Sequence, residues 1–494
     1  MTVLQEPITR PITLNNYVDG EWVASSGELH EVTNPALQEV IAYSPDSSAA
    51  ETSSAITAAK NAFPDWRQTP PVSRARYLFR LKELMEEHFE ELSRIQTLEH
   101  GKTIDESRGE TRRGIEQIEV ATGIPSLLMG YNLEDIASGI DEYVIRQPIG
   151  VFGIIPPFNF PFMVPLWFAP YAVAAGNCVI VKPSPRDPIS QSKVAELVDE
   201  AGFPPGVWNV LHGGMDAANT LIDSPDVDGI AFVGSTPVAK EVYRRCGEVG
   251  KRAIAQGGAK NFVVVMPDTD LSTTIPALMT SFYGNSGQRC LSGANLLVVG
   301  PDSFYTDFMS EVVSATAKIR VGYGLDESVQ MGPMQAPDGK QRVLAYVEEG
   351  VDQGAKLRLD GRATDLVGEY PDTCFLNPSI FENVEPDMSI GREEIFGPVM
   401  SVMRSGDLNS AIEVIGGNPF GNSACIFTTS GKAAREFQYS TVVGNVGVNI
   451  GVAAPMAFFP FGGMKDSFFG ILHGQGQDAI RFFTEGKVVV QRWP

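Results

Sequence analysis

Short apolar runs alternate with amphipathic segments along the chain, and this alternation predicts an α/β fold. The runs at 150–155, 178–181, 208–211 and 229–233 are mostly apolar, as buried parallel strands are. Helical periodicity near 189–202 and 236–247 lies between or after them. We therefore expect a doubly wound parallel sheet that binds its ligands at the carboxyl ends of the strands.

The same pattern begins again near Asn261, which predicts a second α/β lobe. It continues through apolar runs around Val299, Ile380, Val402 and Ile426. Ahead of the first lobe, Asp19-Gly20 predicts a short hairpin, and apolar spacing predicts a helix near 52–63 and a longer one over 73–101. The tail at 487–493 is rich in valine, so we expect it to pair as a strand with another sheet.

One stretch, 147–181, carries no charge, yet it is unlike a lipid-exposed helix. Prolines divide it into short pieces; they are Pro148, Pro156, Pro157, Pro161, Pro165 and Pro170. We interpret it as a buried strand, a loop and a buried helix.

Composition narrows the class of protein. A chain of 494 residues is too long for one compact core, and its net charge of -22 repels nucleic acid and anionic membranes. The 5 cysteines are widely spaced without a C-x-x-C pair, and the 5 histidines are scattered. This pattern favours a reducing cytoplasm and argues against disulfides and a metal centre. Residues 1–10 lack the apolar core of a secretory signal.

Four short motifs carry the chemistry. They are Gly287-Gln288-Arg289-Cys290, Pro157-Phe158-Asn159-Phe160-Pro161, Gly258-Ala259-Lys260-Asn261 and Glu393-Glu394-Ile395-Phe396-Gly397-Pro398. With all four present in this order, the chain resembles the aldehyde dehydrogenase superfamily from about residue 15 to its end. Three segments make it most similar to the CoA-acylating methylmalonate-semialdehyde dehydrogenase branch. They are Gly258 to Asn261, Pro455-Met456-Ala457-Phe458-Phe459 and Gln491-Arg492-Trp493.

The resemblance implies that Cys290 is the nucleophile. A thiolate adds to an aldehyde, and the resulting alkoxide gives a hydride to nicotinamide and leaves a thioester. Asn159 matches the family's side-chain donor to that alkoxide, acting with the backbone N–H of Cys290. Taken alone, Cys290 could be an ordinary buried cysteine and Asn159 a turn residue between prolines.

The resemblance also implies an NAD or NADP site at the strand ends of the first lobe. Lys182 resembles the ribose-binding lysine, and Gly234-Ser235-Thr236 opens a helix whose N-terminus can face the pyrophosphate, although an ordinary helix cap has the same residues. Glu394 and Phe396 match the residues that hold the nicotinamide ribose and ring. The family's later glycine is Ala239 here. The remaining candidate contacts to the cofactor are Ile155, Phe158 and Arg186.

Two positions depart from the general family pattern. The usual general base, a glutamate, is Gln256 here, and an amide cannot take a proton from water. The similar branch also lacks this glutamate and uses coenzyme A as the acyl acceptor; another carboxylate or a water chain could instead activate water. At Pro185, NAD-preferring relatives usually place a glutamate that would repel a 2′-phosphate. Its absence permits NADP, with Arg186 as a candidate partner of the phosphate.

Substrate recognition is expected to depend on Arg113 and Arg289. In the similar branch, arginines at these two positions hold the substrate carboxylate, whereas Arg112 is expected to be a solvated charge. The favoured reaction converts malonate or methylmalonate semialdehyde to acetyl-CoA or propionyl-CoA with loss of CO2. The alternatives are a non-acylating semialdehyde or glyceraldehyde-type dehydrogenase that releases the free acid, and a non-catalytic protein on the same fold.

The expected architecture has three parts. Residues 1–127 and 148–256 form a Rossmann-like dinucleotide-binding lobe, and 257–475 form an α/β catalytic lobe. Segments 128–147 and 476–494 form a β hairpin and a partner strand for oligomerisation. The resemblance implies a homodimer or homotetramer.

Overall fold

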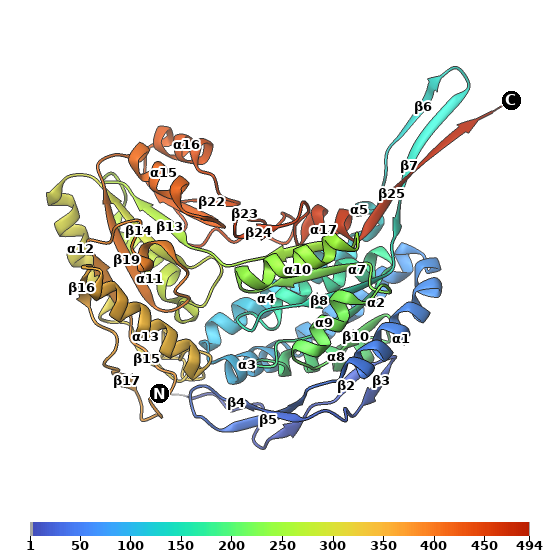
Figure 1. Ribbon diagram of the computed structural model, residues 1–494, viewed down its shortest axis with the longest axis horizontal. Coiled ribbons are helices and arrows are strands. Elements are labelled where there is room, and N and C mark those ends of the chain that lie inside the picture. Colours follow the sequence, from blue (N-terminus) through green and yellow to red (C-terminus); the bar gives the residue numbers. More distant parts are fainter. Residues whose placement is uncertain (1–2, 494) are drawn as a thin grey trace.

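The computed structural model describes residues 3–493, which two large, mainly parallel sheets organise into two lobes (Figure 1). The fold is therefore the α/β architecture that the alternating pattern predicts. A narrow antiparallel arm projects from the first lobe, and the C-terminus lies at its tip (Figure 1).

The first lobe is built on an eight-stranded sheet in the order β24-β12-β11-β8-β9-β10-β2-β3. Strands β12 to β10 in this order are parallel, and the strands at both edges are antiparallel. The predicted strands of this lobe and the hairpin at Asp19-Gly20 are confirmed. Their bounds are β2 (Asn16–Val18), β3 (Glu21–Val23), β8 (Val151–Ile155), β9 (Cys178–Val181), β10 (Trp208–Val210), β11 (Gly229–Val233), β12 (Arg252–Gln256) and β24 (Phe468–Phe469).

Helices cover this sheet, and their apolar faces form one continuous core with it. They are α1 (Ala49–Gln68), α2 (Pro71–Glu87), α3 (Phe89–His100), α4 (Ile104–Thr122), α5 (Ile124–Leu127), α6 (Met163–Leu166), α7 (Ala169–Ala175), α8 (Ile189–Glu200), α9 (Met215–Asp223), α10 (Thr236–Glu248) and α17 (Gly476–Phe482). The charge-free stretch 147–181 forms the end of β7 (Ile140–Pro148), β8, α6, α7 and β9, and its helices are buried. No helix among residues 3–493 is both long and apolar enough to cross a membrane.

The predicted long helix over 73–101 is wrong in one respect, since the structure divides it into α2 and α3. The chain leaves helical geometry at His88, where φ is -97° and ψ is 16°. The apolar spacing continues through this break because both helices pack against α4. Periodicity reports which face is buried, and it does not report a change in helix direction.

The second lobe is built on a seven-stranded sheet in the order β16-β18-β19-β14-β13-β21-β22. Alternate residues of β13 enter two separate cores: Val263 and Val265 pack with α11 and α12, and Phe262 and Val264 pack with α13, α15 and α16. The bounds are β13 (Asn261–Val265), β14 (Gly293–Val299), β16 (Lys356–Leu359), β18 (Ser379–Glu382), β19 (Val399–Ser405), β21 (Ser423–Phe427), β22 (Asn445–Val448), α11 (Leu271–Tyr283), η1 (Gly284–Gly287), α12 (Asp302–Thr316), α13 (Pro337–Asp352), α14 (Ser389–Arg392), α15 (Leu408–Gly417) and α16 (Gly431–Ser440).

Smaller sheets complete the fold. The arm is a three-stranded antiparallel sheet in which the C-terminal strand pairs with the hairpin, as the valine-rich tail predicts. Its strands are β6 (Asn132–Ala137), β7 (Ile140–Pro148) and β25 (Thr484–Arg492). The remaining strands are β1 (Ile12–Thr13), β4 (Leu29–Thr33) and β5 (Val40–Pro45), with the pairs β15 (Val321–Gly322) and β17 (Leu366–Val367), and β20 (Phe420–Gly421) and β23 (Met464–Lys465).

Strand pairing places the boundaries of the lobes at slightly different residues from those expected. Phe468 and Phe469 belong to the first sheet through β12, although the range 257–475 assigned them to the catalytic lobe. Helix α17 packs on α7 of the first lobe, so of the range 476–494 only its β25 part joins the arm. The expected domain boundaries remain a proposal. In it, Phe468, Phe469 and α17 are now assigned to the first lobe.

Candidate active site

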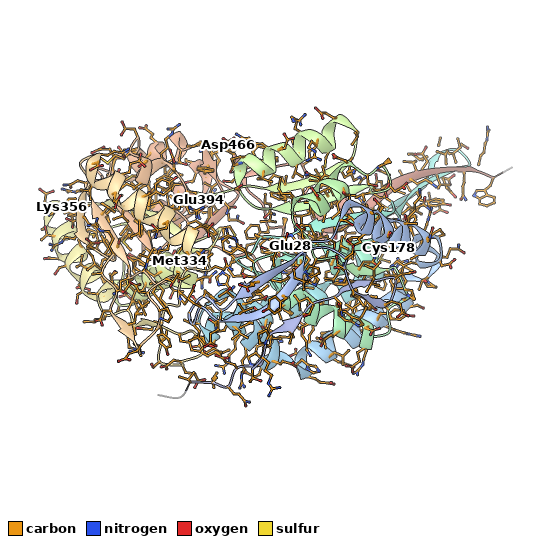
Figure 2. The ribbon with its side chains drawn as sticks, turned by 60° about the horizontal axis from the view of Figure 1, so that its bottom comes forward. Glu28, Cys178, Met334, Lys356, Glu394 and Asp466 are labelled. Carbon is orange, nitrogen blue, oxygen red and sulfur yellow. The ribbon has the colours of Figure 1, made fainter. Side chains whose placement is uncertain are left out.

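Cys290 lies where two cavities meet between the lobes. The cavity on one side has a volume of about 420 Å³, and Arg113, Arg289 and the Cys290 side chain are among the residues that line it. The cavity on the other side has a volume of about 310 Å³ and is lined in part by Asn159, Glu394 and Cys290. Figure 2 shows Glu394 on the second lobe. Cys290 therefore borders both cavities.

The loop before Cys290 has an unusual backbone that the surrounding chain fixes. Asn285, Ser286 and Gly287 all have positive φ, at 55°, 52° and 71°. A Cβ on Gly287 would lie 2.2 Å from the carbonyl oxygen of Gly397, so only glycine fits there. Strained residues of this kind concentrate at functional sites, where neighbouring contacts hold them in place.

Two asparagines hold the carbonyl oxygen of Cys290. The Nδ2 atom of Asn261 donates to it at 2.8 Å, and Nδ2 of Asn422 donates at 2.7 Å. Asn261 also donates to the Ser292 carbonyl, so it clamps the chain on both sides of Leu291. These contacts fix the peptide at the nucleophile and thereby orient its thiol.

Asn159 lies next to this loop, as the oxyanion role requires. Its Nδ2 donates to the Gln288 carbonyl at 2.8 Å, which uses one of the two amide hydrogens and leaves the other for a ligand. The backbone carbonyl of Asn159 accepts a hydrogen bond from Lys102 Nζ at 2.7 Å. Lys102 forms a fully buried ion pair with Glu110, whose other oxygen accepts the backbone N–H groups of Phe162 and Met163. Both ends of the Asn159 loop are thus anchored.

The thiol of Cys290 is held in its neutral form. Burial raises its pKa to about 12, and the nearby Glu394 carboxylate adds to the shift. Arg289 and the backbone N–H groups of Cys290 and Leu291 act in the opposite direction but do not overcome it. Burial also raises the pKa of Glu394 itself, whose Oε1 accepts from Ala259 N at 2.8 Å.

The cavity beside Asn159 gathers most of the candidate cofactor residues: Phe158, Arg186, Gly234, Ser235, Glu394 and Phe396 line it. Helix α10 begins at its edge without a side-chain cap, so backbone N–H groups at its N-terminus are free to bind an anion. Gly258 approaches Glu394 so closely that a Cβ there would lie 2.6 Å from a carboxylate oxygen. A dinucleotide with a pyrophosphate and a ribose fits such residues.

Ile155 ends β8 and Lys182 directly follows the neighbouring strand β9, and neither is among the lining residues of this cavity. Lys182 is buried, and its ammonium group donates to the carbonyls of Pro183 and Gly213. Burial lowers its pKa to about 8. Both residues still lie at the carboxyl edge of the sheet, where the doubly wound pattern places a ligand.

Arg186 already has a partner. Its guanidinium binds Asp338 of α13 with Nη1 at 3.2 Å and Nη2 at 2.6 Å, and it lies over the Phe158 ring. It therefore joins the two lobes across the cofactor cavity. Pro185 lies in a third cavity of about 480 Å³ with His30 and Gly213. An NADP phosphate at Pro185 would have to compete with Asp338 for the Arg186 charge.

The two candidate substrate arginines lie in the wall of the 420 Å³ cavity with different partners. Arg289 forms an ion pair with Glu106 at 2.8 Å, and both side chains are 15% exposed. Arg113 has a longer contact of 3.4 Å to Glu116, and its Nη1 lies 2.7 Å from the Met456 sulfur. Arg112 pairs with Glu86 on the surface, as expected of a solvated charge.

Gln256 is buried at the end of β12. Its Nε2 donates to the Phe461 carbonyl at 3.1 Å, and a Cβ on Gly474 would lie 3.8 Å from that Nε2. An amide held in this way supplies no base for water, which agrees with the sequence argument.

Sequence reasoning missed the residues that support this site. They are Lys102, Glu110, Gln335 and Asn422. Gln335 links the lobes, because its backbone N donates to Gln288 Oε1 at 3.0 Å and its side chain donates to Asp187 at 2.8 Å. Lys102 in Gly101-Lys102-Thr103 precedes a capping box, and this is the one local signal that could have pointed to it. The others act only through long-range contacts.

Comparison with known proteins defines the class. A model of the aldehyde dehydrogenase family matches residues 22–489, so the chain belongs to that family. The fold and the family that the sequence indicates are both confirmed.

The most similar relatives come from one branch of it. Malonate-semialdehyde dehydrogenase 2 of Geobacillus kaustophilus (strain HTA426) is 46% identical over 482 residues, covering 97% of this chain and 99% of that protein. A crystal structure of methylmalonate-semialdehyde dehydrogenase from Oceanimonas doudoroffii has a TM-score of 0.96 at 41% identity, covering 98% and 99% of the two chains. A putative methylmalonate-semialdehyde dehydrogenase from Sinorhizobium meliloti 1021, complexed with NAD, has the same TM-score at 39% identity and the same coverage.

Proposed function

We propose that this enzyme oxidises malonate semialdehyde or methylmalonate semialdehyde through a thioester on Cys290 and transfers the acyl group to coenzyme A. The observation that carries the proposal is the position of Cys290 between a cavity with two arginines and a cavity with the candidate cofactor residues. Relatives that match over nearly their whole length are named malonate-semialdehyde or methylmalonate-semialdehyde dehydrogenase, which supports the substrate class.

The reaction begins when the Cys290 thiolate adds to the aldehyde carbon. The Asn159 amide and the Cys290 backbone N–H donate to the oxyanion, and loss of one such donor costs roughly 10²- to 10³-fold in rate. When bound, NAD or NADP accepts a hydride from the tetrahedral carbon. Arg113 and Arg289 hold the substrate carboxylate, which later leaves as CO2 when its bond to the neighbouring carbon breaks. The electron pair of that bond stays on the neighbouring carbon, which then takes up a proton from water.

Gln256 favours coenzyme A over water as the acyl acceptor. Water needs a base to attack a thioester, and the position that supplies one elsewhere in the family holds a buried amide that donates to a backbone carbonyl. A thiol with a pKa near 8.5 ionises far more readily than water does. The acyl group leaves Cys290 as acetyl-CoA or propionyl-CoA, and the Cys290 thiol is restored.

The experiment is product analysis with malonate semialdehyde, with and without coenzyme A. Without it, we expect a burst of NAD(P)H close to one per active site, followed by a slow steady state. Coenzyme A should raise the steady rate and give a thioester product. Gln256→Glu should release some free acid without coenzyme A, although a misplaced base limits the gain.

A fast steady state that ignores coenzyme A would contradict acyl transfer and favour the alternative that releases a free acid, with Glu394 the first residue to mutate. A protein that neither oxidises aldehydes nor reacts with iodoacetamide at Cys290 would favour the non-catalytic alternative.

A further inference from the structure

Glu106 faces the proposed substrate cavity beside Arg289, and the mechanism above gives it no role. It lies in the first turn of α4, where its Oε2 accepts the Thr103 backbone N–H at 3.1 Å in a capping box. Its Oε1 accepts the Asn285 backbone N–H at 2.6 Å and Arg289 Nη2 at 2.8 Å. One carboxylate thus joins α4, the strained loop before the nucleophile and a candidate substrate arginine.

Arg289 is packed in place and has little freedom to turn away from this acid. Its guanidinium lies so close to Gly284 that a Cβ there would be 2.6 Å from Nη1. The Glu106–Arg289 pair also borders a further cavity of about 320 Å³ on its other side. The pair is therefore a fixed wall between two cavities.

The charges around the substrate cavity do not favour an anion as strongly as two arginines suggest. Arg113 and Arg289 face Asp105, Glu106 and Glu110, all of which line the same cavity. Lys102 offsets Glu110 within the buried pair, and Asp105 is largely exposed and contacts Arg108. Glu106 is the remaining acid, and it lies against one of the two arginines.

Arg113 is in a different situation. Its acidic partner Glu116 is 3.4 Å away and is not among the lining residues of the cavity. A substrate carboxylate near Arg113 meets the arginine charge directly, whereas one near Arg289 meets an ion pair whose charges cancel at a distance.

We propose that Glu106 is a specificity-determining residue that holds Arg289 in the cavity wall and offsets its charge, so that Arg113 is the main anchor for the substrate carboxylate. This inference rests on the proposed function, in which the substrate carries a carboxylate. In this proposal Glu106, and not only the two arginines, sets how strongly the enzyme prefers a substrate with that carboxylate.

The test compares kcat/KM for malonate semialdehyde and for propanal, an uncharged aldehyde, in a set of variants at saturating coenzyme A. Glu106→Gln keeps a hydrogen-bond acceptor and removes the charge. It should raise the ratio of kcat/KM for malonate semialdehyde to kcat/KM for propanal roughly tenfold. The change should come chiefly from a lower KM for the semialdehyde, since stronger ground-state binding lowers KM without raising kcat. An unchanged or lower ratio in a folded variant overturns the proposal.

Two matched variants separate charge from geometry. Glu106→Asp keeps the charge and should stay within about threefold of the wild-type ratio. Asp105→Asn removes an acid from the rim of the same cavity and should change the ratio less than about twofold, because that side chain is 82% exposed. A tenfold rise of the same ratio in Asp105→Asn would show that the overall negative charge around the cavity, and not Glu106 itself, weakens binding of the carboxylate. The proposal would then fail.

A charge-neutral double variant keeps the proposal testable if Glu106→Gln alone does not fold. Glu106→Gln with Arg289→Gln removes both members of the pair and leaves the net charge of the cavity unchanged. Its ratio should stay within about threefold of wild type, while Arg113→Gln should lose roughly tenfold or more. A loss in the double variant as large as that in Arg113→Gln overturns the proposal.

The proposed function fails separately. If the wild-type enzyme shows no preference for the semialdehyde over propanal, the assigned substrate class is wrong, whatever the variants do. If that preference is present and Glu106→Gln leaves it unchanged, only the role of Glu106 is wrong.

Discussion

At the scale of single residues, the protonation of Cys290 decides when the enzyme can react. Burial and the Glu394 carboxylate raise its pKa to about 12, so the thiol keeps its proton at neutral pH in the cofactor-free protein. This arrangement limits oxidation and side reactions of an idle nucleophile.

The rate at which iodoacetamide alkylates Cys290 in the cofactor-free enzyme reports the protonation of this thiol. Because the thiolate is the reactive form, we expect the rate at Cys290 to rise about tenfold per pH unit from pH 7 to pH 10 without a plateau. Glu394→Gln should increase the rate at each pH, since it removes a charge that disfavours the thiolate. Mass spectrometry of the Cys290 peptide follows the reaction, with glutathione as the free-thiol reference. A plateau below pH 8 would show a preformed thiolate.

Pro185 carries the prediction on cofactor choice. No carboxylate stands at this position to repel a 2′-phosphate, so we expect measurable activity with NADP, and Pro185→Glu should shift the preference towards NAD. Arg186 binds Asp338, so NADP gains little from its charge, and Asp338→Asn should raise kcat/KM for NADP more than for NAD. The measurement is kcat/KM for both cofactors in each protein. An unchanged ratio in Pro185→Glu would mean that the ribose binds elsewhere.

At the scale of elements, the loop that carries Asn159 depends on a buried ion pair from α4 and the segment before it. Lys102 and Glu110 have fully buried side chains, and together they bind the carbonyl of Asn159 and two backbone N–H groups of its loop. Removing one member leaves the other as an uncompensated buried charge, which costs about 3–5 kcal/mol of stability.

Lys102→Met should therefore lower the free energy of unfolding by about 3 kcal/mol or more and reduce kcat more than it raises KM. The reason is that the oxyanion donor loses its anchor while both cavities keep their walls. Lys82→Met is the matched control, because Lys82 pairs with Glu86 and Glu119 on the surface, where a pair contributes roughly 0–1 kcal/mol. Urea unfolding and steady-state kinetics measure the two effects. A cost below about 1 kcal/mol for Lys102→Met would contradict the anchoring role.

The elements also show how far a sequence can predict such a site. Cys290 and Asn159 were predictable because each lies in a short motif whose residues are neighbours in the chain. Gln335 was not, since its partner Asp187 lies 148 positions away and nothing local marks either residue as one of a pair. The Glu106 partner of Arg289 is 183 positions away, and its negative charge changes what can be expected of a predicted substrate residue. The strands followed from local apolar runs, whereas the break at His88 depended on how two helices pack against α4.

At the scale of the whole molecule, the arm has the features of an interface between subunits. It stands away from both lobes (Figure 1), and β25 and β6 form its two edges, which have unpaired backbone groups. Large apolar side chains are exposed along it; they are Leu133, Ile136, Val488, Val490 and Trp493. An exposed apolar strand at a sheet edge needs a partner, and another copy of this chain fits the family expectation of a dimer or tetramer.

Val488 and Val490 test this expectation because they lie on the same face of β25 and are 61% and 60% exposed. Val488→Lys with Val490→Lys places two charges on that face, where burial between subunits would be costly, while a solvated strand tolerates lysine well. We expect light scattering after size exclusion to show a smaller assembly than that of the wild-type protein. Val351→Lys is the matched control, since this valine of α13 is 43% exposed and belongs to the second lobe, and it should leave the mass unchanged. An unaltered mass in the double variant would mean that this face of the arm is solvated in the native assembly. The subunit contacts would then have to be sought on another surface.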